Sequence, residues 1–317
     1  MMNLMKSNVE YVVTGGLGFI GSHLVRKLLK SGSGVLVIDD LSNHSENSLD
    51  EFSELKNFQL LQHDICNPLP YLEFTEKSII LFHLAALVSV PDSFNNPLRT
   101  HQVNETGFIH ILNFCKRHNV KKLIYASSCA VYGSSKNIPL QESEYTFPES
   151  PYGLTKLSNE RYAKYFHQSC GLSSIGLRFF NVYGPGQKPD SAYAGVISIF
   201  MDRAMNGKPT TIFGDGEQVR DFVYVGDIAD ALIAAAESNV ELDVFNIGRG
   251  IETSVNDLFK TIQAITGNSE PANYEPPRMG DVLISCSDPS KIKERIGYTA
   301  KWSLEEGLKE LYKSLKK

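Results

Sequence analysis

The sequence predicts a doubly wound α/β fold, a parallel sheet with helices on both faces, and a smaller, less regular C-terminal domain. Three observations predict it: short apolar runs alternate with amphipathic segments, the first run ends in glycines, and the pattern changes after Asn181. Continuous apolar runs are typical of buried parallel strands, and parallel strands need helical crossovers between them.

The predicted strands are six short apolar runs, at residues 9–16, 34–40, 57–64, 78–85, 121–128 and 173–181. A helix is predicted over 18–32, because Ile20, Leu24 and Leu28 recur at helical spacing and Gly32 can end it. Further helices are predicted over 98–118 and 152–170.

A Gly/Pro-rich loop, "VYGPGQKPDSAYAG", begins after Asn181 and marks a change in organisation. We expect residues 8–180 plus about 222–248 to form the main domain. Residues 181–221 and 249–317 are expected to form the smaller domain. The segments at 221–238 and 243–248 are predicted to return to the main sheet.

Composition excludes several classes of protein. The chain has 317 residues, 42% of them hydrophobic, and a net charge of −5 without a basic cluster, so nucleic acid is not a predicted partner. Its five cysteines are scattered, which favours neither a disulfide framework nor a metal site. The first residues lack a signal-peptide pattern and no apolar run is long enough to span a bilayer, so we expect a cytoplasmic protein without membrane contact.

The stretch "TGGLGFIG" is the first candidate binding motif. It places Gly15, Gly18 and Gly21 between a predicted strand and a predicted helix, with Phe19 and Ile20 opening that helix. In this context glycines let the backbone approach a pyrophosphate at the helix N-terminus, whereas in isolation they indicate only a turn. The motif therefore predicts a dinucleotide site on a Rossmann-type domain.

Asp39 ends the second predicted strand, where a carboxylate can accept hydrogen bonds from ribose hydroxyls. A carboxylate there would repel a 2′-phosphate, so NAD is the predicted cofactor; alternatively, Asp39 or Asp40 caps the following turn. Asn104 is either part of this site or a polar helix residue. The other candidate cofactor-binding residues are Asn43, Asp64, Ile65, Leu84, Ala85, Ala86, Ser127 and Phe180.

The stretch "ESPYGLTKLSNERY" carries the candidate chemistry. Pro151 suits the first turn of a helix, so Tyr152 and Lys156, four residues apart, lie on one face. A packed amphipathic helix is the alternative. The preceding "YASSCAVYG" favours a site, because Ser127 and Ser128 end a predicted strand, where ligands bind in such sheets.

A tyrosine becomes a base near neutral pH only if its pKa falls by about 3 units, or about 4 kcal/mol. One ammonium group about 4 Å away supplies roughly that much at an effective dielectric near 20, before desolvation is subtracted. We therefore expect Lys156 to lower the pKa of Tyr152, with the cationic nicotinamide adding to the effect.

The glycine loop, "YASSCAVYG", "YGLTK" and "LRFFNVYGPG" together resemble the extended short-chain dehydrogenase/reductase superfamily. The later "GEQVRDFVYVGD" and "RMGD" are most similar to NAD-dependent UDP-hexose 4-epimerases. The resemblance implies that Tyr152 is the base, that Lys156 lowers its pKa and binds the nicotinamide ribose, and that Ser128 hydrogen-bonds the reacting hydroxyl. It also implies a transient 4-keto sugar that rotates and takes the same hydride back, so NAD stays bound.

Residues of the predicted smaller domain are implied to bind the nucleotide sugar. Arg220 and Arg278 match positions that clamp a diphosphate, although either could be a surface ion pair, and Asp281 matches a uridine-ribose position. Val196, Thr211 and Phe213 fall in segments that line the nucleotide pocket in the family.

Asn181 and Gly186 separate this chain from UDP-uronate 4-epimerases, in which an arginine suits the carboxylate. Ala130 leaves no acidic residue for the additional chemistry of dehydratases and decarboxylases. Ser285 lies where enzymes restricted to plain hexoses carry a tyrosine, so acceptance of UDP-GlcNAc and UDP-GalNAc is expected alongside UDP-Glc and UDP-Gal. The alternative is that Ser285 is only a strand-edge residue.

Three rival functions remain open: a UDP-uronate 4-epimerase, a one-way nucleotide-sugar dehydrogenase, and an NAD-binding sensor without turnover. The resemblance also implies a homodimer joined through helices near 98–118 and 152–170, although most of their apolar residues would be core in any case.

Overall fold

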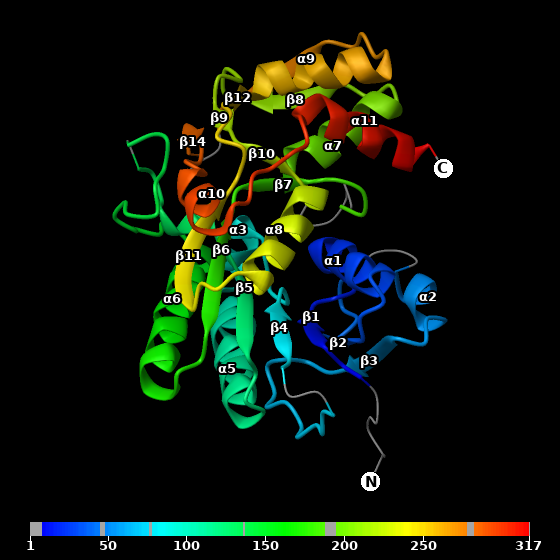
Figure 1. Cartoon of the computed structure of the whole chain (residues 1–317). Helices are drawn as coiled ribbons and strands as arrows, with labels where there is room; N and C mark the ends of the chain where they lie inside the picture. The colour runs from blue at the N-terminus through cyan, green and yellow to red at the C-terminus, as the bar shows by residue number, and fades with distance from the viewer. Residues whose placement is uncertain are drawn as a thin grey trace.

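The computed structural model of the chain describes residues 8–44, 48–75, 78–135, 137–187, 195–277 and 282–316. Its largest feature is a seven-stranded sheet of order β11-β6-β5-β4-β1-β2-β3 (Figure 1). The strands are β1 (Tyr11–Thr14), β2 (Val35–Asp39), β3 (Phe58–Gln62), β4 (Ile80–His83), β5 (Lys122–Ser128), β6 (Ser174–Phe179) and β11 (Leu242–Ile247). Every neighbouring pair in this sheet is parallel. The predicted doubly wound fold class is confirmed.

Helices cover both faces of the sheet and bury separate apolar cores. On one face, Leu24 and Leu28 of α1 pack with Ile228 and Leu232 of α8. On the other face, α5 and α6 share a core that includes Phe108. The helices are α1 (Phe19–Lys30), α2 (Ser48–Ser53), α3 (Val90–Asn95), α4 (Pro97–His101), α5 (Gly107–Arg117), α6 (Pro151–Cys170), α7 (Val196–Met205), α8 (Val225–Glu237), α9 (Val255–Thr266), α10 (Ser290–Ile296) and α11 (Leu304–Leu315).

The segment predicted as one helix over 98–118 is interrupted. It consists of α4, a π-helical turn at Gln102–Thr106, and α5. Such turns occur mostly as local insertions within α-helices and are frequent at functional sites. Here the turn carries Asn104, whose side-chain amide forms hydrogen bonds with the backbone of Leu87, 17 residues earlier in the chain.

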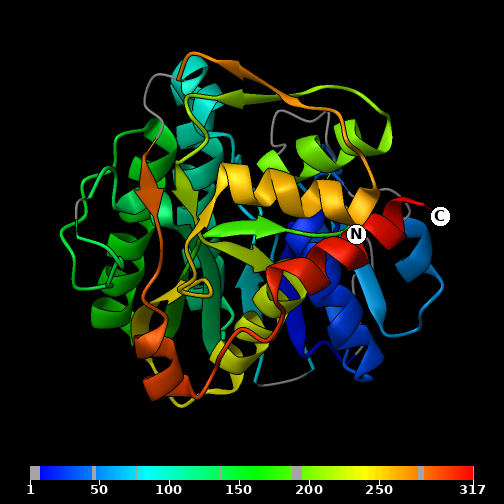
Figure 2. The same ribbon diagram turned by 90° about the horizontal axis from the view of Figure 1, so that it is seen from above.

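The C-terminal part builds a second core above the carboxyl edge of the main sheet. Figure 2 shows α9 and α11 crossing over this region, where Leu258 and Leu308 are buried together. Short strands accompany the helices: β7 (Asn181–Tyr183) with β10 (Phe222–Tyr224), β8 (Thr210–Phe213) with β13 (Ala272–Glu275), and β9 (Val219–Arg220) between β12 (Thr253–Ser254) and β14 (Ile284–Ser285).

One prediction about the returning segments is confirmed and the other is wrong in part. Residues 243–248 do return, because β11 pairs with β6 at the edge of the main sheet. Residues 222–224 instead pair with β7 outside it, and only the following helix α8 packs on the main sheet. The physical reason is that β7 begins just beyond the end of β6, and β10 forms its parallel hydrogen bonds with β7 there.

The strand order reverses between β1 and β4, which are neighbours in the sheet although their crossovers leave in opposite directions. At such a point the loops after the two strands separate and leave a crevice outside their carboxyl ends. Gly15 follows β1 and has a φ of 67°. A Cβ at Gly15 would lie 2.7 Å from the Ala85 nitrogen, so only glycine allows these two loops to approach so closely.

Candidate active site

A cleft of about 430 Å³ lies at this crevice. It extends from the glycine loop, past the ends of β4 and β5, to the start of α7. The predicted site residues that line it are Gly15, Gly18, Phe19, Ile20, Gly21, Asp39, Asn43, Asp64, Ile65, Leu84, Ala85, Ala86, Ser127, Ser128, Tyr152, Lys156, Phe180, Asn181 and Val196. Residues far apart in the sequence therefore meet around a single cavity.

The glycine loop leaves room for a ligand at one position and packs tightly at another. A Cβ at Gly21 would lie 2.0 Å from the Gly15 oxygen, so this glycine serves helix–loop packing. A Cβ at Gly18 would meet no described atom closer than the Gly15 oxygen at 3.3 Å, and Gly18 lines the cleft. A side chain at Gly18 would occupy space in which a pyrophosphate can reach the N-terminus of α1. The loop therefore fits a dinucleotide.

Asp39 lines the cleft beyond the glycine loop, and its side chain also stabilises the neighbouring turns. Its carboxylate accepts hydrogen bonds from the backbone N–H groups of Leu17 (3.0 Å) and Leu41 (2.9 Å). Burial raises its pKa, while the two backbone hydrogen bonds lower it. Asp40 caps the following turn by accepting from the Ser42 N–H at 3.0 Å. Both members of the pair therefore have a turn-forming role, and Asp39 also faces the cleft with remaining acceptor capacity.

The far end of the cofactor side is lined by Asp64, Ile65 and Arg99. Arg99 lies 3.6 Å from the Asp64 carboxylate and donates to the Cys66 sulfur at 3.2 Å. Sequence reasoning missed Arg99, because a single arginine in a helical segment carries no distinguishing local pattern.

Asn104 does not line the cleft. Its side chain is buried, accepts from the Leu87 N–H and donates to the Leu87 oxygen, both at 2.8 Å. It thereby fixes the loop after β4, which carries the cleft residues Ala85 and Ala86. Asn104 therefore supports a loop of the cleft from behind, and its contact with the cofactor stays a prediction.

Helix α6 brings Tyr152 and Lys156 to the end of β5. The helix starts where Ser150 accepts from the Gly153 N–H at 3.0 Å, with Pro151 in the first turn. Tyr152 is 8% exposed and Lys156 is 2% exposed. The Lys156 ammonium donates to the Ala126 oxygen at 2.9 Å and lies 5.7 Å from the centroid of the Tyr152 ring.

Ser128 completes this group from the end of β5. Its hydroxyl accepts from the Ala130 N–H at 3.2 Å, and its interaction with the phenol acts to lower the pKa of Tyr152. A phenol, an ammonium and a hydroxyl thus share the wall of the cleft that faces the glycine loop. This arrangement can exchange a proton with a ligand hydroxyl and bind it through a second hydroxyl.

The expected lowering of the Tyr152 pKa is wrong for these side chains alone. Burial raises the pKa of Tyr152 to about 12, and the hydrogen bond with Ser128 opposes this rise without reversing it. Burial also lowers the pKa of Lys156 to about 8. Desolvation penalises both charged forms, and the lysine is directed to the Ala126 oxygen rather than the phenol oxygen.

Among the short strands of the C-terminal part, Ser285 lies directly opposite Arg220 where β14 pairs with β9, and neither residue is among those that line the cleft. Cys129, which directly follows Ser128 in the chain, interacts with this pair. Burial raises the pKa of its thiol, while a hydrogen bond with Ser285, the charge of Arg220 and a hydrogen bond with Ser128 lower it. Sequence reasoning missed Cys129, although its place beside Ser128 was a usable signal.

Other predicted substrate residues are not gathered at the cleft. Thr211 and Phe213 lie on β8, which pairs with β13, and neither is among the residues lining the cavity. Arg278 and Asp281 lie outside the described residues. The prediction that Thr211 and Phe213 lie near the nucleotide depended on a segment that has no specific sequence motif.

The part of the chain that the structure describes lacks two further kinds of feature. No group of three or more His, Cys, Asp or Glu side chains is arranged to hold a metal ion there. Nor does any described helix combine the length and apolar character needed to cross a bilayer.

Comparison with known proteins places these features in a family. Residues 11–248 match the NAD dependent epimerase/dehydratase family. A UDP-N-acetylglucosamine 4-epimerase from Methanobrevibacter ruminantium, solved with UDP-N-acetylmuramic acid, has a TM-score of 0.90 and 39% identity over 98% of this chain and 99% of that chain. The UDP-glucose 4-epimerase of Thermotoga maritima, solved with UDP-glucose, has a TM-score of 0.88 and 39% identity over 96% and 98%.

A further relative, the UDP-glucuronate 4-epimerase of Thermodesulfobacterium geofontis, is 33% identical over 94% of both chains. The chain belongs to the NAD dependent epimerase/dehydratase family. Its cofactor is NAD, as the sequence predicted, and the residues around the glycine loop fit that group.

We predict that the pKa of Tyr152 falls when NAD binds, because the oxidised nicotinamide ring is cationic and favours the phenolate. The measurement is tyrosinate absorbance against pH, as the difference between wild type and Tyr152→Phe, with and without NAD. NADH, whose ring is neutral, is the matched control and should shift the titration less. An identical titration in all three states would contradict the prediction.

Proposed function

We propose that this chain interconverts UDP-hexoses that differ in configuration at carbon 4, and that it accepts N-acetylated as well as plain sugars. The observation that carries the proposal is the meeting of Ser128, Tyr152 and Lys156 in the cleft that also contains the dinucleotide loop. The family and its relatives make the protein an NAD-dependent UDP-sugar 4-epimerase. The roles of individual residues below are part of the proposal.

Tyr152 takes the proton from the 4-hydroxyl of the sugar and later returns it. Ser128 hydrogen-bonds that hydroxyl, because its side chain lines the same cleft as Tyr152. Lys156 binds on the ribose side and keeps a positive charge near the phenol. NAD, when bound, supplies a reversible two-electron acceptor for the hydrogen on carbon 4. The 4-keto sugar turns within the cleft between the two transfers, so both configurations are reached with one base.

We assign residues 8–180 and about 222–248 to NAD and residues 181–221 and 249–317 to the nucleotide sugar. Arg220 is proposed to bind the diphosphate, because it lies beside Ser285 and its charge reaches Cys129 near the cleft. From the sequence alone, Arg278 is also proposed to bind the diphosphate and Asp281 to bind the uridine ribose. This division leaves the reacting carbon at the junction, where Asn181 and Val196 line the same cleft as Tyr152.

The uronate alternative is disfavoured by charge. A sugar carboxylate needs a cation, and the Lys and Arg residues among the described cleft-lining positions are Arg99 and Lys156. Arg99 lies at the opposite end beside Asp64, and Lys156 is proposed to bind the nicotinamide ribose. Asn181 and Gly186 line the cleft and are uncharged. The sensor alternative does not explain why Tyr152, Lys156 and Ser128 are all present together.

We expect the purified protein to convert UDP-GlcNAc and UDP-Glc to their 4-epimers without net formation of NADH. Separate incubations with these two sugars and with UDP-GlcA, analysed by NMR, measure this. Conversion of UDP-GlcA alone would identify the uronate enzyme, and net loss of NAD would identify a dehydrogenase. Retained NAD with no conversion of any sugar would favour the sensor.

We predict that Ser285→Tyr lowers kcat/KM for UDP-GlcNAc at least about 10-fold more than for UDP-Glc, because the larger side chain fills space needed by the acetamide. Initial rates with both sugars measure the ratio. Ser285→Ala removes the hydroxyl but keeps the space, and it should leave the ratio near that of wild type. Equal losses on both sugars in Ser285→Tyr would remove the specificity role.

We further propose a homodimer that uses α3, α4 and α6. These helices pack together, and they leave Leu98 and Leu154 exposed by 66% and 56%. Burial of such residues against a second copy would remove apolar surface from water.

We predict that light scattering of the wild-type protein gives twice the mass of one chain. The double variant Leu98→Glu/Leu154→Glu should give the mass of one chain. Leu55→Glu, at an exposed apolar residue elsewhere, is the control. A wild type that is monomeric at micromolar concentration would contradict the dimer.

A further inference from the structure

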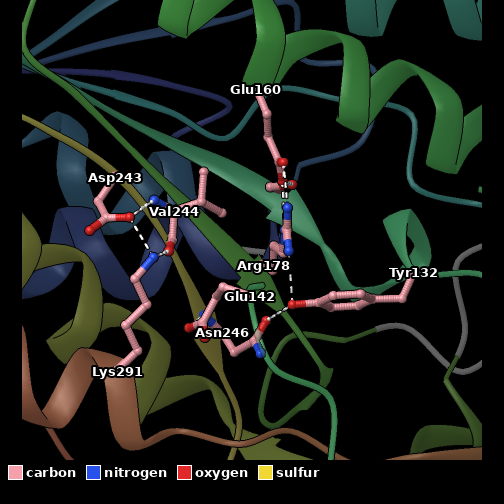
Figure 3. Close-up of polar contacts among 9 residues, drawn as sticks. Tyr132, Glu142, Glu160, Arg178, Asp243, Val244, Asn246 and Lys291 are labelled. Atoms are coloured by element: carbon pink, nitrogen blue, oxygen red, sulfur yellow. Dashed lines mark hydrogen bonds and ion pairs between the residues drawn. The ribbon is translucent and has the colours of Figure 1, made fainter. Parts of the chain in front are cut away.

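A buried ion pair lies behind the cleft, between helix α6 and strand β6. Arg178 of β6 donates through Nε and Nη2 to both carboxylate oxygens of Glu160, at 2.9 and 2.7 Å (Figure 3). The two residues are 5% and 9% exposed. Neither lines the cleft, and the proposed chemistry assigns neither of them a role.

Glu160 links the ion pair to the wall of the cleft that carries the catalytic candidates. The Ser127 hydroxyl donates to Glu160 Oε1 at 2.6 Å, and Ser127 itself lines the cleft beside Ser128. Glu160 lies one helical turn beyond Lys156, which donates to the Ala126 oxygen. Helix α6 is therefore attached to the end of β5 at two successive turns.

Arg178 links the ion pair to the proposed substrate side. It does so through a series of hydrogen bonds in which each donor and each acceptor is determined. Arg178 Nη1 donates to the Tyr132 hydroxyl at 2.8 Å, and that hydroxyl donates to the Asn246 oxygen at 2.7 Å. The Asn246 amide then donates to the Leu140 oxygen at 2.8 Å. Because a guanidinium only donates, each later donor and acceptor is determined, and Figure 3 shows the side chains in this sequence.

Leu140 connects the chain of hydrogen bonds to the strand that bears Ser285. Its backbone N–H donates to the Cys286 oxygen at 2.8 Å, and its oxygen accepts from the Asp288 N–H at 2.8 Å. Cys286 directly follows Ser285. The hydrogen bonds and chain neighbours thus form a continuous path from Ser127 to the backbone beside the proposed specificity residue.

Stability alone is a poor explanation for such a pair. Taking two charges out of water offsets much of their attraction, and apolar replacements of similar volume are often neutral or stabilising. What apolar side chains cannot reproduce is the direction of the hydrogen bonds to Ser127 and Tyr132. Small displacements of reacting groups can reduce turnover strongly even when the fold is intact.

We propose that Glu160 and Arg178 are positioning residues that fix Ser127, and with it the face of α6 that carries Tyr152 and Lys156, relative to the strand that bears Ser285. This inference rests on the proposed epimerase function. It adds a structural link between the NAD side and the sugar side of the site, formed by residues that contact neither ligand.

The test compares Glu160→Leu/Arg178→Met, an apolar replacement of the pair, with Asp243→Leu/Lys291→Met. The control removes the other ion pair drawn in Figure 3, which joins β11 to α10 and does not reach Ser127. Melting temperature, kcat, KM and the Kd of NADH by fluorescence are measured for both. We expect Glu160→Leu/Arg178→Met to stay folded with KM within about 3-fold and kcat reduced at least about 10-fold, while the control keeps kcat within about 2-fold.

Ser127→Ala is the second variant, because it removes one hydrogen bond and leaves the ion pair in place. It should fold even if the double variant does not, with the melting temperature of wild type and a kcat reduced at least about 3-fold. An unchanged kcat in Ser127→Ala, or in a folded Glu160→Leu/Arg178→Met, would overturn the inference. Equal loss of kcat in the control would overturn it as well.

Failure of the proposed function gives a different result. A wild type that converts no UDP-sugar contradicts the epimerase, and the Kd of NADH then decides the positioning role. A Kd raised at least about 5-fold in Glu160→Leu/Arg178→Met, against an unchanged Kd in the control, supports it, because Glu160 and Arg178 lie outside the cleft lining and act on NADH only through Ser127 and α6. Equal values of Kd would refute it.

Discussion

The attachment of helix α6 to the carboxyl end of β5 is the constraint on which the site depends. Lys156 bonds the Ala126 oxygen, and Glu160 accepts from the Ser127 hydroxyl one turn later. These contacts direct one face of the helix at the crevice where the strand order reverses. They thereby help to set the position of Tyr152 relative to Ser128 and to the glycine loop across the cleft.

The burial that accompanies this geometry also disfavours ionisation of Tyr152 and Lys156. Burial raises the pKa of Tyr152 to about 12 and lowers that of Lys156 to about 8, so the protein by itself disfavours both charged forms. Proton transfer therefore depends on charge that arrives with the ligands. Such a dependence is useful in an enzyme that must hold a reactive keto sugar only when its cofactor and substrate are both in place.

Local patterns predicted the backbone geometry around the glycine loop and the start of α6 well. The glycines, the strand ends and the helix from Pro151 are short, contiguous signals, and each determines a backbone geometry on its own. The i, i+4 spacing of Tyr152 and Lys156 correctly predicted a shared face. It did not predict the direction of the lysine, because the Ala126 oxygen that binds it comes from a different strand.

Features that depend on distant pairing were not visible in the sequence. Asn104 contacts Leu87 through a π-helical turn that apolar periodicity does not reveal, and β10 pairs with β7 rather than with the main sheet. The path from Glu160 through Arg178 and Tyr132 to Asn246 joins four separate segments by side-chain hydrogen bonds. Each of its residues, taken alone, is an ordinary polar residue in a strand, helix or loop.

The most direct test of the account is the turnover of Tyr152→Phe, which removes only the phenol oxygen and keeps the ring packing. With NAD still bound at wild-type stoichiometry and melting temperature unchanged, kcat for UDP-Glc should fall at least about 100-fold. Tyr162→Phe, on the same helix but outside the described cleft lining, serves as the control. Turnover of Tyr152→Phe within a few-fold of wild type would mean that another group moves the proton and that the buried tyrosine is only packed there.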